Sequence, residues 1–555
     1  MRWMPVVALA AAFPSVAAQQ PVLLLQGEPF AEGMMTLHVS ARPHAGEFVW
    51  ITLGLDPLPL EAPELTAKGG WFAGFLLGAL PIGVVPPGGL LQASFSMPAL
   101  TAGAESVPLV LQALVASTLS NPATLALDEP FLLASQAQFL PPPLPAEAAL
   151  FGDSVAAGDF NADGAIDLAV GAWHEDVDGV EQAGRVYVLY GPTLAPFHTL
   201  QATFVAPFLH FGHGLVVADF SGDGVDDLGI AHGPGGDPPL TQHGNVFVLR
   251  GGAGFPGVLL ATAASAGTGV EAWNFGRTMV AGDLDADGSP DLVVGAPGAA
   301  VAGLAGAGRL EVFAGPALAA PLVVPNPEPT AGDAFGTRAA LGDVGGDGAL
   351  EIVESSGSAD AGAVVDAGCL HVFAGATLDL LLTLDDPEPV AGDRFGEALL
   401  VGELWGGPPN EIVVADASDH VHVLRDVLGA LAVYPVPKPP TPNPTDAPGA
   451  FGSLFGLLDA NGDGALDLVI ADPSEGDATG CGLAPAGGAV YAALAPYFAT
   501  FRRLGNPQPA CGEAFGWGLL VHDLDGDGAP ELIAGNTTAD AGALADAGCV
   551  VIVSP

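Results

Sequence analysis

Seven short loops of this chain each begin with an acidic residue, and most carry oxygen-bearing side chains at alternating positions. The first has the form D-x-N-x-D-G-x-x-D and runs from Asp159 to Asp167. Calcium is a hard cation that takes six to eight oxygen ligands, so carboxylates and amides gathered in one tight turn suit it. The Gly at the sixth position, Gly164, allows a backbone reversal that other residues resist. The pattern predicts calcium sites.

Five loops keep four ligands each, although Ser221 is a weaker donor at the third position of its loop. The expected ligands are Asp159, Asn161, Asp163 and Asp167; Asp219, Ser221, Asp223 and Asp227; Asp283, Asp285, Asp287 and Asp291; Asp459, Asn461, Asp463 and Asp467; and Asp523, Asp525, Asp527 and Glu531. The alternative, solvated Asp-Gly turns, would crowd like charges repeatedly without a counter-ion. An EF-hand would need a Glu at position twelve, where the first loop has Val170, so a helix–loop–helix site is excluded.

Two loops depart from the pattern. The fourth offers Asp343, Asp347 and Glu351 but has Gly345 at the third ligand position, so its calcium binding is an open question. The fifth, residues 403–411, is too poor in ligands to hold an ion.

A Phe-Gly pair stands eight residues before each of these loops, and the pair recurs about every 60 residues. The pairs begin at Phe151, Phe211, Phe275, Phe335, Phe395, Phe451 and Phe515. Short β-branched and aromatic runs bounded by Gly and Asp flank each loop, and no helical period separates them. Four antiparallel strands in each of seven units predict an all-β fold with a seven-bladed β-propeller over residues 131–555.

The ring is expected to close with a strand from outside the repeats. The last unit ends after its third strand, Cys549–Val553, and an extra run, Ala134–Leu140, precedes the first Phe-Gly pair. Residues 131–150 are therefore predicted to supply the missing strand, which would hide two exposed sheet edges.

These units resemble the FG-GAP repeats of integrin α-subunits. Phe-Gly stands in all seven units, and the Gly-Ala-Pro element is complete at Gly295–Pro297 and partial at Gly171-Ala172. The resemblance covers about three quarters of the chain. It implies a seven-bladed propeller with calcium in the loop between the first two strands, and partners that dock on the opposite face.

The composition excludes several partners. The formal charge is −49, with 62 acidic and 13 basic residues. Nucleic acid binding needs clustered Lys and Arg, so nucleic acid is not an expected partner, and the same holds for anionic membranes. A strongly acidic chain that takes up calcium fits an extracellular setting.

The N-terminus has the features of a secretory signal over residues 1–18, with Arg2, an apolar centre and a small-residue cleavage site. No later segment is expected to span a membrane, so the prediction is a secreted, extracellular or cell-surface protein. Residues 19–130 contain strand-like runs such as Met35–Ser40 and Phe48–Leu53. These runs predict a small β-rich domain, for which a β-sandwich is a possible fold.

Four cysteines fit an oxidising compartment. Cys481 and Cys511 are predicted to pair, with Cys511 and Cys549 as the rival pair, while Cys369 and Cys549 should be too distant to pair.

Three functional classes compete. The leading one is a monomeric, calcium-stabilised binding or cell-adhesion module for an extracellular protein or glycan. The alternatives are a structural envelope or matrix component without a discrete ligand and, less favoured, an accessory module of a hydrolytic enzyme; no catalytic residues are assigned, since the chain has no nucleophile elbow. The second-to-third-strand loops and inter-blade connectors should form the ligand face, with distinctive residues at 173–178, His210, His213, His232 and His243.

Overall fold

The computed structural model describes the backbone of nine strands between residues 10 and 124. It also describes residues 137–555, apart from 203–204, 234–243, 267–274, 440–449, 477–486, 496–497, 499, 508–512, 542–543 and 555. The chain divides into two compact units, one of residues Met1–Glu129 with Pro496–Phe501 and one of Pro130–Ala495 with Arg502–Pro555. Within the described part, no helix is long and apolar enough to cross a membrane.

The first unit contains two sheets. β2, β3 and β6 form an antiparallel sheet, and the second sheet has the order β5-β4-β1-β7-β8, with β9 also on β7. The strands are β1 (Ala10–Ala11), β2 (Val22–Gln26), β3 (Met34–Ser40), β4 (Phe48–Leu55), β5 (Leu80–Val84), β6 (Leu90–Ser96), β7 (Leu109–Val115), β8 (Thr118–Leu119) and β9 (Ala123–Thr124).

The second unit is a seven-bladed β-propeller, as predicted. Each of the first six blades is a four-stranded sheet in chain order. Blade one contains β11 (Val155–Gly158), β12 (Asp167–Ala172), β13 (Arg185–Leu189) and β14 (Phe197–Leu200); blade two contains β15 (Leu215–Ala218), β16 (Asp227–His232), β17 (Asn245–Leu249) and β18 (Leu259–Ala264). Blade three contains β19 (Met279–Gly282), β20 (Asp291–Ala296), β21 (Arg309–Phe313) and β22 (Leu322–Pro325); blade four contains β23 (Arg338–Gly342), β24 (Glu351–Ser356), β25 (Cys369–Ala374) and β26 (Leu380–Asp385).

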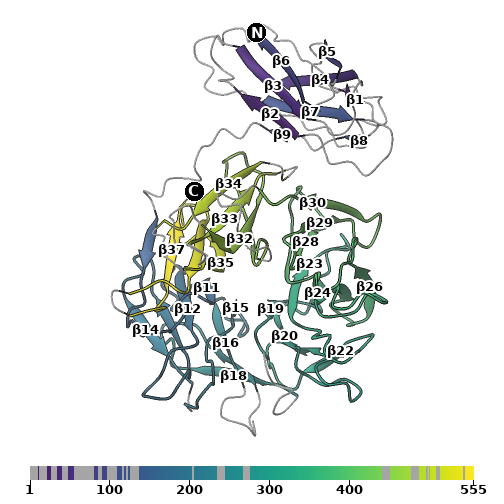
Figure 1. Ribbon diagram of the computed structural model, residues 1–555. Coiled ribbons are helices and arrows are strands. Elements are labelled where there is room, and N and C mark those ends of the chain that lie inside the picture. Colours follow the sequence, from purple (N-terminus) through teal and green to yellow (C-terminus); the bar gives the residue numbers. More distant parts are fainter. Residues whose placement is uncertain are drawn as a thin grey trace. The chain divides into compact units, whose positions relative to one another are not determined.

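The remaining blades follow the same plan up to blade seven. Blade five contains β27 (Ala398–Gly402), β28 (Glu411–Ala415), β29 (Val421–Arg425) and β30 (Ala432–Val436); blade six contains β31 (Phe455–Leu458), β32 (Asp467–Gly476), β33 (Gly487–Ala493) and β34 (Phe501–Gly505). Blade seven has the order β10-β37-β36-β35, from β10 (Gln138–Leu140), β35 (Phe515–His522), β36 (Glu531–Asn536) and β37 (Cys549–Val553). Figure 1 shows the first strands β11, β15, β19, β23 and β35 on the inner side of the ring and β14, β18, β22 and β26 on its outer side.

Two strands from opposite ends of the propeller sequence close the ring. β10 pairs antiparallel with β37, and Phe139 lies opposite Val551. Because β10 precedes blade one and β37 ends blade seven, this pairing joins the first and last parts of the propeller. It is the pairing expected from the run that precedes the first Phe-Gly pair.

The seven Phe side chains of the Phe-Gly pairs form the core between neighbouring blades. All are at most 3% exposed. Phe211 at the start of blade two packs with Ala169 and Val186 of blade one, and Phe151 packs with Ile533 of blade seven. Each Phe thus joins its own blade to the preceding one.

A side chain at the Gly of the Gly-Ala-Pro element in blade three would clash with the next blade. A Cβ built on Gly295 would lie 2.0 Å from the carbonyl oxygen of Gly336, in the Phe-Gly pair of the next blade. In blade four the equivalent residue is Ser355, whose hydroxyl donates to the Gly396 carbonyl at 2.6 Å. Gly295 therefore allows the backbone of blade four to approach β20 closely, whereas Ser355 reaches blade five through a hydrogen bond.

Candidate metal centres

The acidic loops connect the first and second strands of each blade. In blade one, Asp159 follows β11, and Asp167 is the first residue of β12. The position-one carboxylate organises the loop: Asp159 Oδ1 accepts from the Asp163 N–H at 3.1 Å, and its Oδ2 accepts from the Gly164 N–H at 2.9 Å. Asn161 Oδ1 accepts from the same Asp163 N–H at 2.8 Å. The side chains of Asp159 and Asn161 are thus fixed by the backbone of their own loop.

Convergence of the carboxylates is clearest in blades three and seven. One carboxylate oxygen from each of Asp283, Asp285 and Asp287 lies within 4.8 Å of the others, and the same holds for Asp523, Asp525 and Glu531. Each group has three carboxylates close enough to share one ion, which is the donor chemistry of a calcium site. The carboxylates of these two loops therefore fit a calcium ion.

The loops of blades one and six have matching hydrogen bonds within the loop. Asp459 accepts from the Asp463 and Gly464 N–H groups at 3.1 and 2.8 Å, as Asp159 does in blade one. In both loops position three is Asn, which carries no charge. These loops therefore offer one carboxylate fewer than those of blades three and seven.

The ninth-position acids differ from the others because they are buried. Asp167 is fully buried, and its two oxygens accept from the Phe160 N–H at 3.2 Å and the Gly191 N–H at 2.9 Å. Asp291 and Asp467 make the same pair of bonds, to a loop amide and to an amide beyond the third strand. Burial raises the pKa of Asp167 and Asp467 to about 6. This carboxylate therefore ties the loop to the third strand.

Blade two has an arginine at its loop. Arg250, directly after β17, lies 2.8 Å from Asp223 Oδ2, and this hydrogen bond lowers the pKa of Asp223. The guanidinium engages one of the predicted ligands, and Ser221 supplies no charge. The Arg250 guanidinium thus occupies an oxygen that the sequence pattern assigns to calcium.

The two divergent loops also fold as turns. Asp343 in blade four accepts from the N–H groups of Asp347 and Gly348 at 3.0 and 2.9 Å, and Gly345 leaves the third ligand position without a side chain. In blade five that position is Trp405, whose indole lies 5.4 Å from the Arg425 guanidinium and 5.1 Å from the Tyr434 ring. An aromatic and cationic contact replaces the oxygen ligand there.

Sequence reasoning missed a link between neighbouring loops. Asp226, at the eighth position in blade two, accepts from the Asp159 N–H of blade one at 2.9 Å. Asn410 of blade five likewise accepts from the Asp343 N–H of blade four at 2.8 Å. The loops of these blade pairs are joined on the same face of the ring, and an oxygen-bearing side chain at position eight was the available signal.

The residues expected on the ligand face differ in their burial and contacts. Glu175 of blade one is buried and bonds Tyr187 at 2.8 Å, so it is a structural group. Trp173, His174 and His210 form an aromatic cluster with ring centroids 3.8 to 5.6 Å apart. His243 and the predicted disulfide partners Cys481 and Cys511 lie outside the described residues.

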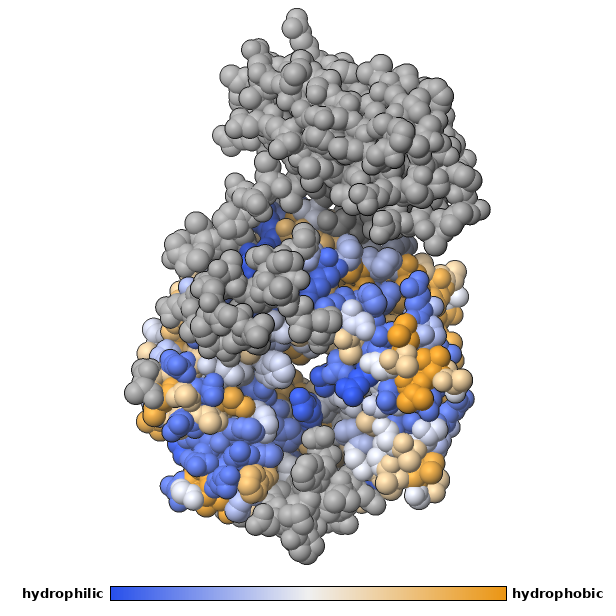
Figure 2. Space-filling model, viewed as in Figure 1, coloured by the Kyte–Doolittle hydropathy of each residue, from blue (hydrophilic) through white to orange (hydrophobic). Residues whose placement is uncertain are grey.

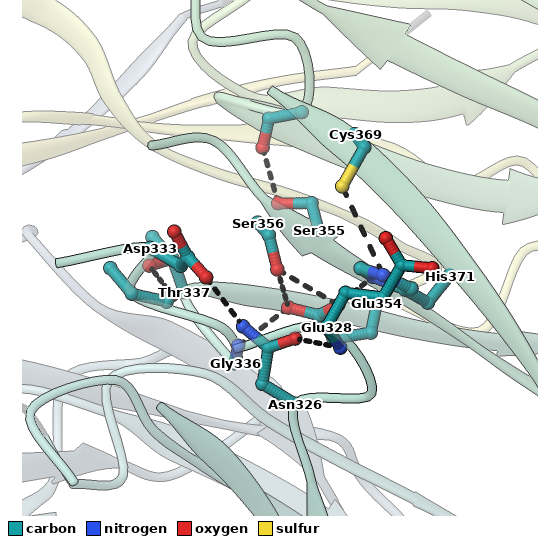
Figure 3. Close-up of polar contacts among 12 residues, drawn as sticks. Asn326, Glu328, Asp333, Gly336, Thr337, Glu354, Ser355, Ser356, Cys369 and His371 are labelled. Atoms are coloured by element: carbon teal, nitrogen blue, oxygen red, sulfur yellow. Dashed lines mark hydrogen bonds and ion pairs between the residues drawn. The ribbon is translucent and has the colours of Figure 1, made fainter. Parts of the chain in front are cut away.

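Blade four contains a buried polar network that the sequence reasoning did not identify. Figure 3 shows Glu354 between Ser356 and His371, with the Cys369 thiol facing the imidazole. His371 Nδ1 lies 3.0 Å from Glu354 Oε2, and Cys369 Sγ lies 3.9 Å from His371 Nε2. Glu354 also accepts from the Gly336 N–H at 2.5 Å. In blade two the corresponding amide, of Gly212, donates to the Ala231 carbonyl instead.

The residues of this network have a structural role. Burial, followed by the nearby Glu354 carboxylate, raises the pKa of the Cys369 thiol far above its ordinary value. A protonated, buried thiol is a poor nucleophile. Cys369 and Cys549 are both free cysteines.

Comparisons with known proteins agree with the repeat pattern. The FG-GAP repeat family model matches residues 151–189 and 275–313. The chain thus contains FG-GAP repeats at these two positions, in blades one and three of its seven-bladed β-propeller.

The relatives that match part of this chain include a phospholipase D and an integrin alpha chain. Rat phosphatidylinositol-glycan-specific phospholipase D is 34% identical over 164 residues, which are 27% of this chain and 19% of that protein. Xenopus laevis integrin alpha-5 is 36% identical over 162 residues, which are 27% of this chain and 15% of that protein. The chain thus matches less than a fifth of the length of these relatives. A crystal structure of BBS1N in complex with ARL6DN has a TM-score of 0.44 and 11% identity over 75% of this chain and 97% of that chain.

Proposed function

We propose that this protein is a secreted, calcium-stabilised binding or adhesion module for an extracellular protein or glycan. The observation that carries the calcium assignment is the convergence of three carboxylates in each of the loops of blades three and seven. Bound there, calcium supplies positive charge that offsets carboxylate repulsion at the turn joining two blade strands.

The chain's own residues do the remaining work. The position-one acids and the buried position-nine acids fix each loop through backbone N–H bonds, so the ligands are arranged before an ion arrives. Pre-arrangement of this kind reduces the ordering cost of binding. The second-to-third-strand loops and connectors of the ring are the surface on which a partner would dock.

A binding role is favoured over an enzymatic one. Propellers host many functions, so the fold alone decides little. Among the described residues, the Cys, His and Glu side chains of blade four come closest to a catalytic arrangement, and their burial and raised thiol pKa argue against it. A structural envelope or matrix component without a ligand is the second candidate, favoured by the strong acidic charge.

The test is direct binding of the full-length protein to arrays of glycans and extracellular matrix proteins, in millimolar calcium and again in chelator. The proposal expects saturable binding to a restricted set of ligands that weakens in chelator. Absence of saturable binding in both conditions would favour the structural alternative.

A further inference from the structure

The residue after each Phe-Gly pair stands just before or at the innermost strand of its blade, so seven such residues surround the central axis. They are Asp153, His213, Arg277, Thr337, Glu397, Ser453 and Trp517. The neighbouring inner strands contact one another around the ring, from β11 through β35. In the view of Figure 2, hydrophilic residues border the opening at the centre of the ring.

A pocket of about 370 Å³ opens beside this ring at blades three to five. Its lining includes Arg277, Thr337, Arg338 and Glu397, together with Pro297 and Gly332 from a second-to-third-strand loop and a connector. The pocket therefore lies on the side of the blades opposite the acidic loops. Its volume is at the lower end of the roughly 300–1,000 Å³ typical of small-molecule sites.

The two arginines in this pocket differ from most basic side chains of the described residues, which form ion pairs. Six other basic side chains lie 3.5 Å or less from a carboxylate oxygen: Arg185, Arg250, Arg309, Arg425, Lys438 and Arg503. Within the described residues, no such ion pair involves Arg277 or Arg338. Arg338 Nη1 instead donates to the Thr337 carbonyl at 3.2 Å.

The donors of the two arginines are available to an anion. Burial, and then the neighbouring Arg277 guanidinium, lower the pKa of Arg338, and Glu397 opposes this shift. In a chain with a formal charge of −49 and 13 basic residues, two like-charged guanidinium groups share one small pocket. Asp153 is near Arg277, and Glu397 lines the pocket, but among the described residues neither carboxylate forms an ion pair with these arginines. Guanidinium donors therefore remain for a bound anion.

We propose that this pocket binds an acidic sugar, with its carboxylate between Arg277 and Arg338 and its hydroxyl groups on Glu397 and Thr337. Arginine suits this role because its planar donors match a carboxylate. The inference rests on the proposed binding function and specifies its site and ligand class.

Glu397 distinguishes an acidic sugar from an acidic peptide. Glu397 repels the carboxylate of either ligand, but an aspartate-rich peptide brings several carboxylates, whereas an acidic sugar brings one together with hydroxyl groups that donate to Glu397. The Thr337 hydroxyl already donates to the Ala334 carbonyl at 2.6 Å, so it remains an acceptor for a ligand hydroxyl. The pocket therefore combines cations for one acidic group with acceptors for several hydroxyls.

The experiment is calorimetric titration of the full-length, calcium-loaded protein with an oligosaccharide ending in glucuronate, with the neutral glucose analogue and with an aspartate-rich peptide. We expect binding of the acidic sugar alone. R277Q and R338Q should each weaken it by at least about tenfold, because charge-assisted hydrogen bonds are lost. R394Q, at an exposed arginine outside the pocket lining, is the matched control and should leave affinity unchanged.

The variant E397Q separates the two ligand classes. It should weaken binding of the acidic sugar, because an amide oxygen is a poorer acceptor than a carboxylate. Undiminished or tighter binding of the acidic sugar by E397Q, or sugar binding that survives both arginine substitutions, would overturn the assignment. Melting curves of each variant with and without calcium test folding and the calcium proposal separately. A normal calcium response without sugar binding would therefore refute the pocket assignment alone.

Discussion

At the residue scale, the four oxygen ligands predicted for the blade-three loop do different work. Asp285 and Asp287 are exposed and converge with Asp283, whereas Asp291 is buried and accepts two backbone N–H groups. The repeated acidic pattern could be predicted from the sequence because it is local. This division of labour could not, because it depends on an amide that lies beyond the third strand.

The substitution Asp287→Ala should remove much of the stabilisation that calcium gives through the blade-three loop. An ion that binds only the folded state adds about 2.7 kcal/mol per site at a hundredfold excess over its Kd, and the variant should lose up to that amount. Thermal unfolding at several calcium concentrations measures it. Glu403→Ala is the control, because its loop has Trp405 where a ligand would stand. Equal calcium responses of the two variants would contradict site-specific binding.

The Asp153 carboxylate should make stability depend on pH. Burial raises its pKa from 3.8 to about 6, with Arg277 opposing the shift. The folded state therefore holds more protons than the unfolded state between these values, so Asp153 lowers the free energy of unfolding as pH rises from about 4 to 6.

Asp153→Asn removes this penalty. The variant should be more stable than the parent at pH 7, by at most about 3 kcal/mol, and the two should converge near pH 4. Denaturant unfolding at a series of pH values measures the difference. A difference between the two proteins that stays constant from pH 4 to 7 would show that Asp153 does not titrate in this range.

At the scale of elements, the strands and their order followed from the sequence because short alternating runs and the Phe-Gly spacing are repeated seven times. Contacts between elements were harder to predict from the sequence. The pairing of Arg250 with Asp223 and the bond from Asp226 to the preceding loop join residues that are remote in sequence. Glu354 stands where blade one has Val170, and only its neighbours in space explain it.

The closing strand β10 provides the prediction at this scale. A shortened chain that begins at Phe151 lacks β10, so the outer edge of β37 would be unpaired and its apolar residues exposed. Such an edge promotes association between chains. We expect aggregation and a lower unfolding temperature than for a chain beginning at Leu127, measured by light scattering and calorimetry. Equal behaviour of the two chains would contradict a stabilising role for β10.

At the scale of the whole molecule, charge and ring geometry combine. The formal charge of −49 opposes compaction, and the acidic loops concentrate part of that charge on one face of the propeller. Five bound ions would carry about ten positive charges, so calcium should act on the whole ring and not on single loops alone. Exposed pairs such as Arg250 and Asp223 contribute little by comparison.

Removal of calcium should therefore lower the stability of the entire propeller. Each loop registers two strands of a blade, and the blades are joined through buried Phe residues, so loosening of several loops would weaken the interfaces between blades as well. Chelator should lower the calorimetric melting temperature and increase proteolysis within the loops, and readdition of calcium should reverse both effects. Extracellular modules bind with Kd values of about 10⁻⁴–10⁻³ M, so the response should extend into the millimolar range. Magnesium at the same ionic strength is the control, because it resists losing its water ligands. A melting transition that is identical with calcium, magnesium and chelator would mean that the loops are ordinary acidic turns.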